Sequence, residues 1–440
     1  MTVHQPEPSP RTGRRIPRRR LWMYRLAILL MLFGVAEFLS WVAMIMLGAP
    51  TSTALLREQQ AATATGAMTS AGATEAIHPY LGWVRNPQIS LPEKFGSTDI
   101  QTNRLGFLDN GPSVRKRSPD KFLIAIAGGS VAWQFSWEAE KRLTEHLKSL
   151  PELQNRTIEY VRIAMPGYKQ PQQLMALNYV MALGGEFDLV INMDGFNDGV
   201  LSLVENVDHG TALDYPRSWH ARSLVMTDPQ ISEQAFRLLG LRAQRQQRSR
   251  QALTSWFRWS WCYQLVWYVR DNAARDELLE LEVEVNRAND VSFIHHGPAV
   301  PRQSREENQR DAALLWARCS EQMHDLCKAK GIAYLHVLQP NQYVDNSKPL
   351  SDYEKENCFA GGQPMAETAR SVFPKMAEEG KRLGERGIAF SDQTMVFRDI
   401  TETLYVDPWC HFNQQGNDLL ADAVFEQIQS LKLIKPMAIP

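Results

Sequence analysis

The stretch from Phe122 to Ser130, FLIAIAGGS, consists of six apolar residues, two glycines and a serine. A short run of this kind is typical of a strand buried on both faces of a parallel sheet. Similar runs occur at 158–167 (IEYVRIAMPG), 187–195 (FDLVINMDG) and 332–340 (IAYLHVLQP), with a less regular fifth at 389–397 (AFSDQTMVF). Amphipathic segments lie between them at 137–150, 170–183 and 308–330. The alternation predicts an α/β fold with a doubly wound parallel sheet.

Polar residues stand where these runs end. The ends read Gly128-Gly129-Ser130, Pro166-Gly167 and Asp194-Gly195-Phe196-Asn197-Asp198, and Asp407-Pro408-Trp409-Cys410-His411 precedes a helical run at 414–431. Ligands of doubly wound sheets bind beyond the carboxyl ends of the strands, so these residues are candidates for a site. They include the parts that acyl transfer needs: a nucleophile, a base, a carboxylate that orients the base, and donors for an oxyanion.

The four blocks resemble those of the SGNH hydrolases, a branch of the GDSL esterases and lipases, and more closely their membrane-anchored bacterial members. The resemblance covers about residues 78 to 432. It implies a flavodoxin-like three-layer αβα fold with Ser130 as nucleophile and His411 as general base, oriented by Asp407. It also implies an oxyanion hole formed by Ser130, Gly167 and the Asn197 side chain.

The sequence departs from the family pattern at two positions. Gly129 stands where the family name implies an aspartate, a variation common in the branch that this sequence resembles. Three residues, rather than the usual two, separate Asp407 from His411. Asp399 is therefore an alternative carboxylate, and the extra residue bears on the orientation and basicity of the histidine rather than on the mechanism itself.

The N-terminal region has the charge pattern of a membrane anchor. Residues 1–25 carry seven arginines and one acid, and residues 26–48 carry a single charge, Glu37. The 23 residues of that second segment are long enough to cross a bilayer as one transmembrane helix. The preceding arginines predict a cytoplasmic N-terminus, with the rest of the chain outside. The alternative is a cleaved signal peptide.

The chain divides by composition into four regions. These are a basic cytoplasmic N-terminus (1–25), the transmembrane helix (26–48), a tether rich in Ala, Thr, Gly and Ser (49–77), and an SGNH-hydrolase-like domain (78–440). That domain contains a helical insertion at about 200–304, in which five arginines precede a cluster of aromatic residues at 256–268. The aromatic rings suit a sugar face or a bilayer surface. The alternative is an aromatic stripe that packs on the domain and leaves a solvated basic face.

The sequence contains ten histidines, which can bind a metal, and five cysteines, which can bind a metal or form disulfides. The sequence has neither an H-E-x-x-H motif nor a paired C-x-x-C motif, so we expect no metal and no cofactor. Cys319 and Cys327 lie too far apart along one predicted helix to bridge each other. In an oxidising compartment, Cys358 and Cys410 are predicted to pair and fix the histidine loop.

Together these features predict a membrane-anchored serine esterase that acts outside the cytoplasm. In a Gram-negative cell this location would be the periplasm. The resemblance suggests an O-acyl substrate, in particular an O-acetyl ester on a cell-envelope or exported polysaccharide. One alternative is an O-acetyltransferase that uses the same acyl-serine intermediate, and another is a non-enzymatic envelope or glycan-binding protein. The net charge of -1 gives no chain-wide attraction to nucleic acid, so no such partner is expected.

Overall fold

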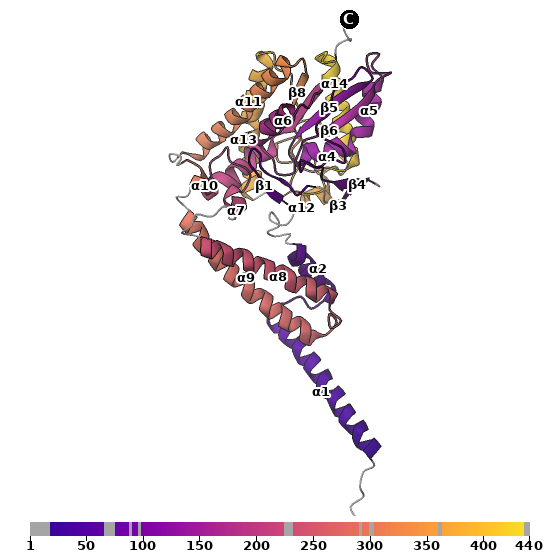
Figure 1. Cartoon of the computed structure of the whole chain (residues 1–440), viewed down its shortest axis with the longest axis vertical. Helices are drawn as coiled ribbons and strands as arrows, with labels where there is room; N and C mark the ends of the chain where they lie inside the picture. Colours follow the sequence, from indigo (N-terminus) through magenta and orange to yellow (C-terminus); the bar gives the residue numbers. More distant parts are fainter. Residues whose placement is uncertain are drawn as a thin grey trace, which may run out of the picture. The chain divides into compact units, whose positions relative to one another are not determined.

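A computed structural model describes residues 18–65, 75–87, 90–95, 98–223, 232–289, 293–298, 303–359 and 363–434 of the chain (Figure 1). The chain forms two compact units, each assembled from separate parts of the sequence. The first unit combines Met1–Ser70 with Gln234–Glu284, and the second combines Ala71–Glu233 with Val285–Pro440.

The second unit is built on a five-stranded parallel sheet with the strand order β6-β5-β7-β8-β9. The strands are β5 (Lys121–Gly128), β6 (Thr157–Arg162), β7 (Leu189–Asp194), β8 (Ala333–Leu338) and β9 (Phe390–Asp392). All five predicted runs are thus confirmed as strands. The fifth is much shorter than its run, because the Asp392 carboxylate accepts hydrogen bonds from the backbone N–H and hydroxyl of Thr394 and ends the strand in a turn.

Two groups of helices accompany the sheet, as a three-layer αβα arrangement requires. In the first group, α14 (Gln414–Ser430) contacts both α4 (Ser130–Glu138) and α5 (Glu140–Lys148). In the second, α11 (Arg305–Ala329) contacts α6 (Gln172–Ala182) and α13 (Pro364–Glu385). The predicted helix at 137–150 is in fact the end of α4 and the whole of α5, which meet at Ala139.

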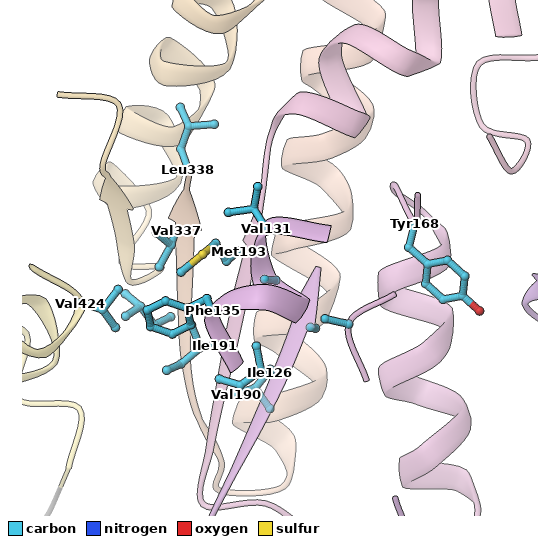
Figure 2. Close-up of a cluster of buried hydrophobic side chains, with 14 of the residues drawn as sticks. Ile126, Val131, Phe135, Tyr168, Val190, Ile191, Met193, Val337, Leu338 and Val424 are labelled. Carbon is cyan, nitrogen blue, oxygen red and sulfur yellow. The ribbon is translucent and has the colours of Figure 1, made fainter. Parts of the chain in front are cut away.

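The core covers both faces of the sheet, and one part of it lies between the first helix group and the sheet. Figure 2 shows Val131 and Phe135 of α4 and Val424 of α14 beside Ile191 of β7 and Val337 of β8. All five side chains are buried. Helix α4 begins at Ser130, so this packing also fixes the start of the helix at the end of β5.

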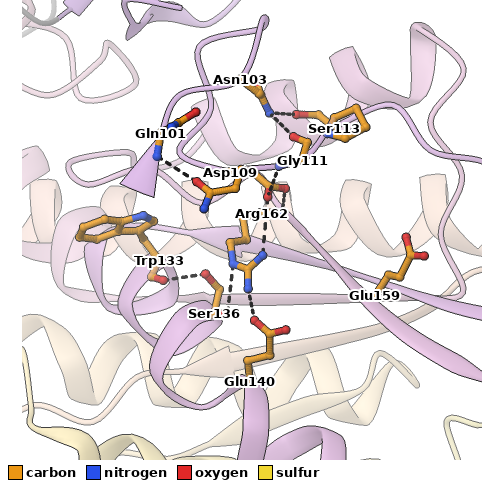
Figure 3. Close-up of polar contacts among 12 residues, drawn as sticks. Gln101, Asn103, Asp109, Gly111, Ser113, Trp133, Ser136, Glu140, Glu159 and Arg162 are labelled. Carbon is orange, nitrogen blue, oxygen red and sulfur yellow. Dashed lines mark hydrogen bonds and ion pairs between the residues drawn. The ribbon is translucent and has the colours of Figure 1, made fainter. Parts of the chain in front are cut away.

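The segment before the sheet forms two antiparallel hairpins. Strand β1 (Glu75–His78) pairs with β2 (Gly82–Arg85), and β3 (Ser90–Phe95) pairs with β4 (Thr98–Gln101). Arg162, at the end of β6, connects the loop around Asp109, which lies between the hairpins and the sheet in the sequence, to α4 (Figure 3). Its backbone N–H donates to Asp109, and its guanidinium donates to the Ser136 carbonyl oxygen at 3.1 Å.

The shorter elements of the second unit follow the sheet strands. A π-helix, η1 (Asn197–Asn206), and a 3₁₀ turn, η2 (Val207–His209), come directly after β7. The remaining short helices are α7 (Trp219–Arg222), α10 (Phe293–His296) and α12 (Asp352–Asn357).

The first unit consists of the helices α1 (Arg18–Met46), α2 (Thr53–Thr65), α8 (Ser232–Thr254) and α9 (Trp261–Asn289). Within α1, the segment Trp22–Met46 is long and apolar enough to cross a membrane. This helix begins before the predicted start at residue 26 and ends two residues before residue 48. The predicted insertion is helical, but α8 and α9 fold with α1 and α2.

Helix α2 occupies part of the segment that composition predicts to be a tether. Residues 53–65 are rich in Ala, Leu, Gln, Glu and Arg, which favour a helix. Leu56 is buried in a cluster with Met44, Ala252 and Trp267, so the helix also has a packing partner. The prediction is therefore wrong for 53–65, and residues 66–74 of the predicted tether lie outside the described residues.

Candidate active site

Ser130, His411 and Asp407 form a continuous hydrogen-bonded chain. His411 Nε2 lies 2.7 Å from Ser130 Oγ, and His411 Nδ1 lies 2.6 Å from Asp407 Oδ2. Burial raises the pKa of Asp407, but the hydrogen bond and charge of His411 outweigh burial and hold that pKa below its ordinary value. A histidine acts as a base toward a serine when one ring nitrogen is hydrogen-bonded to an ionised carboxylate and the other to the serine hydroxyl. His411 has both contacts.

The extra residue between Asp407 and His411 is absorbed by the backbone of the loop. Cys410 adopts the left-handed conformation, with φ of +68°. The Trp409 N–H donates to Asp407 Oδ1 at 2.8 Å, so the loop closes on its own carboxylate. The alternative carboxylate, Asp399, is exposed, and the carboxylate paired with His411 is that of Asp407.

Two glycines bring the serine to the end of β5. Gly128 has a φ of +140°, and an added Cβ there would lie 2.0 Å from the Met193 carbonyl oxygen. Gly129 has an ordinary φ of −89°, but an added Cβ would lie 2.4 Å from Asn197 Nδ2. The Asn197 amide therefore occupies the space that a side chain at position 129 would need.

The candidate oxyanion donors lie on neighbouring segments. Asn197 Nδ2 donates one hydrogen to the Tyr168 carbonyl oxygen at 2.8 Å, and the same nitrogen lies against Gly129. Gly167 has a φ of +92°, and no acceptor in the described part of the chain bonds to its N–H. Ser130 is the first residue of α4, where a backbone N–H has no partner within the helix. Asn197 thus connects the Ser130 segment with the Gly167 segment.

A buried carboxyl group, Asp198, holds these segments in position. It accepts hydrogen bonds from the backbone N–H groups of Gln170, at 2.6 Å, and Gly195, at 3.2 Å. Burial, followed by the charge of Asp194, raises the pKa of Asp198 to about 8. Burial also lowers the pKa of Lys169, whose ammonium group donates to the Leu213 carbonyl oxygen.

Glu138, at the end of α4, connects that helix to the histidine loop. Its carboxylate accepts a hydrogen bond from Asn417, which also donates to the Phe412 carbonyl oxygen at 3.2 Å. Burial and the charge of Asp418 raise the pKa of Glu138 from 4.5 to about 7. The helix that carries the serine and the loop that carries the histidine are therefore joined by a carboxyl group that titrates near neutrality.

Sequence reasoning missed two side chains beside Gly167. An added Cβ on Gly167 would lie 3.4 Å from Arg217 Cδ and 3.6 Å from the Trp83 ring. Arg217 pairs with Glu205 through two hydrogen bonds, of 2.6 and 2.7 Å, and lies over the Trp409 ring. Because Arg217 lies in the insertion, 50 residues from Gly167 along the chain, no local motif indicated this contact.

The predicted disulfide between Cys358 and Cys410 is wrong. Both thiols are free and buried, and Cys358 Sγ donates to the Tyr405 carbonyl oxygen at 3.3 Å. Burial raises the pKa of both thiols. The histidine loop is instead closed by backbone hydrogen bonds, from Val406 N–H to the His411 carbonyl and from Asn413 N–H to the Leu404 carbonyl. Among the described residues, no group of three or more His, Cys, Asp or Glu side chains could hold a metal ion.

Comparisons with known proteins give only distant structural likenesses. No family model matches the chain, and no curated protein matches it. Among solved structures, the chain is similar to a GDSL-like lipase from Bacteroides thetaiotaomicron, with a TM-score of 0.34 and 10% sequence identity. The alignment covers 72% of this chain and 93% of that chain.

Proposed function

We propose that the protein is a serine hydrolase of the SGNH type that cleaves an ester through an acyl-enzyme on Ser130. The observation that carries this proposal is the hydrogen-bonded chain of Ser130, His411 and Asp407, with bonds of 2.7 and 2.6 Å. A serine hydroxyl far below its own pKa is a poor nucleophile until a base takes its proton. His411 is within reach of that proton, and Asp407 stabilises the imidazolium that results.

The reaction proceeds in two transfers. Ser130 Oγ attacks the acyl carbonyl while His411 takes the hydroxyl proton, and the oxyanion receives hydrogen bonds from Ser130 N–H, Gly167 N–H and Asn197 Nδ2. His411 then gives the proton to the departing alcohol oxygen, leaving an acyl-serine. Water, deprotonated by His411, attacks this ester, and collapse of the second oxyanion releases the acid and restores Ser130.

The test is covalent labelling combined with turnover. The full-length protein should react with a fluorophosphonate probe and hydrolyse a chromogenic acetyl ester, and Ser130→Ala should abolish both. Ser430→Ala, at the exposed end of α14, is a matched control and should leave both unchanged. Labelling or turnover that survives in Ser130→Ala would show that this site is not the reactive one.

We further propose that the substrate is an O-acetylated polysaccharide outside the cytoplasm. Support comes from the rim of the candidate site, where Trp409 is 37% exposed only two residues from His411. An exposed indole offers a flat apolar face for a sugar ring, with Arg217 beside it for polar groups. Acetate released from an O-acetylated polysaccharide would support hydrolysis. Acetyl esters formed on an added sugar acceptor would instead assign a transferase.

We also propose that α1 anchors the protein in a membrane, with the N-terminus in the cytoplasm. The support is the length and apolar composition of Trp22–Met46, together with the arginines that precede it.

A further inference from the structure

The turn between α8 and α9 exposes an unusual group of aromatic side chains. Residues 255–260 read Ser-Trp-Phe-Arg-Trp-Ser, and Trp256, Phe257 and Trp259 are 92%, 65% and 58% exposed. Large apolar side chains gathered on one surface indicate a contact with a partner or a lipid phase. We call residues 255–260 the aromatic turn.

Glu37 of α1 fixes the position of the aromatic turn. One carboxylate oxygen accepts a hydrogen bond from the Ser260 hydroxyl, and the other accepts from the Trp261 N–H at 2.6 Å. Trp261 is the first residue of α9, so a carboxylate on one helix caps the N-terminus of another. The charged residue in the middle of the predicted membrane segment therefore holds the turn against α1.

From that contact, α9 runs along α1 in the same direction (Figure 1). Trp267 packs in a buried cluster with Met44 of α1 and Ala252 of α8. Met44 lies seven residues beyond Glu37, and Trp267 lies six residues beyond Trp261, so the two helices advance together by about 10 Å. By contrast, the α1 side chains from Trp22 to Ala36 are exposed and have no protein cover.

We place this contact near the outer edge of the bilayer, so that α1 crosses it with the exposed stretch Trp22–Ala36 and not with the whole of Trp22–Met46. Arg25, near the inner end of that stretch, can extend its guanidinium to the headgroups. Arg20, the last of the clustered arginines, is seventeen residues before Glu37, or about 25 Å along the helix, against roughly 30 Å of hydrocarbon. Polar contacts at the same level exclude a deeper position. The Arg57 guanidinium lies 3.7 Å from the centre of the Trp259 ring, and Gln60 donates to Gln264 at 2.6 Å.

Three arginines lie in the aromatic turn and on the two helices that it joins. Arg248, Arg258 and Arg270 are exposed, and no carboxylate in the described part of the chain pairs with them. Arg248 and Arg270 line a hollow of about 110 Å³ between α8 and α9, together with Tyr263 and Trp267. Asp271 also lines the hollow, and its carboxylate is paired with Arg245, so Arg248 and Arg270 leave the hollow with a net positive charge. Arginines can bind the charged headgroup of an anionic lipid, and neighbouring aromatic rings can contact its acyl chains.

We propose that the aromatic turn is a second membrane contact: its rings lie in the outer interface, and Arg248, Arg258 and Arg270 bind anionic phospholipid headgroups. Aromatic side chains concentrate at this level of membrane proteins because one part of the ring system is apolar and another is polar. The inference rests on the proposed anchoring by α1, because only then is the level of Glu37 a level in a bilayer.

The first experiment measures the depth of the turn in the full-length protein, in nanodiscs of phosphatidylcholine and phosphatidylglycerol. A nitroxide is attached at Trp256→Cys, Leu279→Cys or Leu30→Cys, in a Cys262→Ser background because the other native thiols are buried. For each label we measure the ratio of its collision rate with oxygen to its collision rate with a water-soluble nickel chelate. We expect this ratio to be severalfold higher for the label at 256 than for the label at 279. Leu279 is exposed on α9 about 27 Å beyond Trp261.

The label at Leu30, on the uncovered part of α1, separates two kinds of failure. A water-exposed label at 256 with a lipid-exposed label at 30 would overturn this inference and leave the anchor in place. A water-exposed label at 30 would overturn the anchoring itself, and the inference with it.

The second experiment tests the arginines. Raising the phosphatidylglycerol fraction of the nanodiscs should raise the Tm of the wild-type protein, because a ligand that binds only the folded state stabilises it. Arg248→Gln/Arg258→Gln/Arg270→Gln should lose that dependence. The control is Lys141→Gln/Lys328→Gln/Lys381→Gln, which removes equal charge from exposed positions of the second unit. Its Tm should still rise with the phosphatidylglycerol fraction. An unchanged dependence in the arginine variant would overturn the headgroup assignment.

Discussion

Gly129 is constrained by space rather than by backbone conformation. Its φ of −89° is open to any residue, but an added Cβ would lie 2.4 Å from Asn197 Nδ2. We therefore expect Gly129→Ala to displace the Asn197 amide while leaving Ser130 and His411 in place. Loss of one oxyanion donor lowers kcat by on the order of 10² to 10³. Steady-state kinetics with a chromogenic acetyl ester measures the effect.

Gly384→Ala is the matched control for that prediction. Gly384 lies in α13, and an added Cβ would meet nothing within 4 Å. It should preserve kcat and leave stability unchanged or slightly higher, because alanine favours a helix. If Gly129→Ala retained wild-type kcat with an unchanged fold, Asn197 could not have the proposed role.

Asp407 is expected to contribute strongly to kcat, although three residues rather than two separate it from His411. Its 2.6 Å bond to His411 Nδ1 holds the ring with Nε2 toward Ser130. In Asp407→Asn the amide can donate to Nδ1 and favour the wrong tautomer, so kcat should fall by roughly 10² to 10⁴. Asp399→Asn alters the exposed alternative carboxylate and should have no effect. Equal activity losses in the two variants would argue against the Asp407 assignment.

The sequence indicated the site residues that follow strands, and it could not indicate those that reach the site from elsewhere. Ser130, Gly167 and Asn197 follow β5, β6 and β7, and parallel strands bring such ends to one edge of a sheet. Arg217 reaches Gly167 from the insertion and leaves no local pattern in the sequence.

At the level of elements, the strands were easier to predict than the helix partners. A strand buried on both faces is apolar along most of its length, so β5, β7 and β8 stand out in the sequence, although β7 also buries Asn192 and Asp194 and β8 buries His336. An amphipathic helix shows only that one face is covered. The sequence therefore predicted a helical insertion but could not show that α8 and α9 pack with α1, or that Glu37 caps α9.

The connection between α4 and the histidine loop should depend on pH. Glu138 has a pKa of about 7 in the folded protein, because of burial and the charge of Asp418, against 4.5 as its ordinary value. Between these values the unfolded chain loses this proton while the folded protein keeps it, so stability falls as pH rises through about 7 and then levels off. Glu138→Gln keeps an acceptor for Asn417 and removes the titration.

Thermal unfolding at pH 5 and pH 8 checks this expectation. The variant should match the wild type at low pH and be more stable at pH 8. Glu145→Gln, at an exposed position on α5, should follow the wild type at both pH values. A Glu138→Gln advantage that appeared only at pH 5 would contradict the direction of the shift.

At the level of the whole molecule, the proposed topology predicts which side of the membrane each end of the chain faces. A reporter that is active only outside the cytoplasm should be active when fused after Pro440. Deleting residues 14–20 removes five of the seven N-terminal arginines and should reduce that activity, because flanking arginines set the orientation. A C-terminal reporter active only in the cytoplasm would exclude the topology.

The way the chain divides into units affects whether the second unit could be released from a membrane that α1 crosses as proposed. The chain passes between the two units three times, after Ser70, after Glu233 and after Glu284. A stalked enzyme is released by one proteolytic cut in its stalk. Here a cut after Ser70 would still leave the second unit covalently joined to α8 and α9, which pack on α1 through Glu37 and Met44. Release of a soluble fragment would require cleavage of all three passages, or a cut after Ser70 together with melting of the helix contacts, so this architecture favours retention.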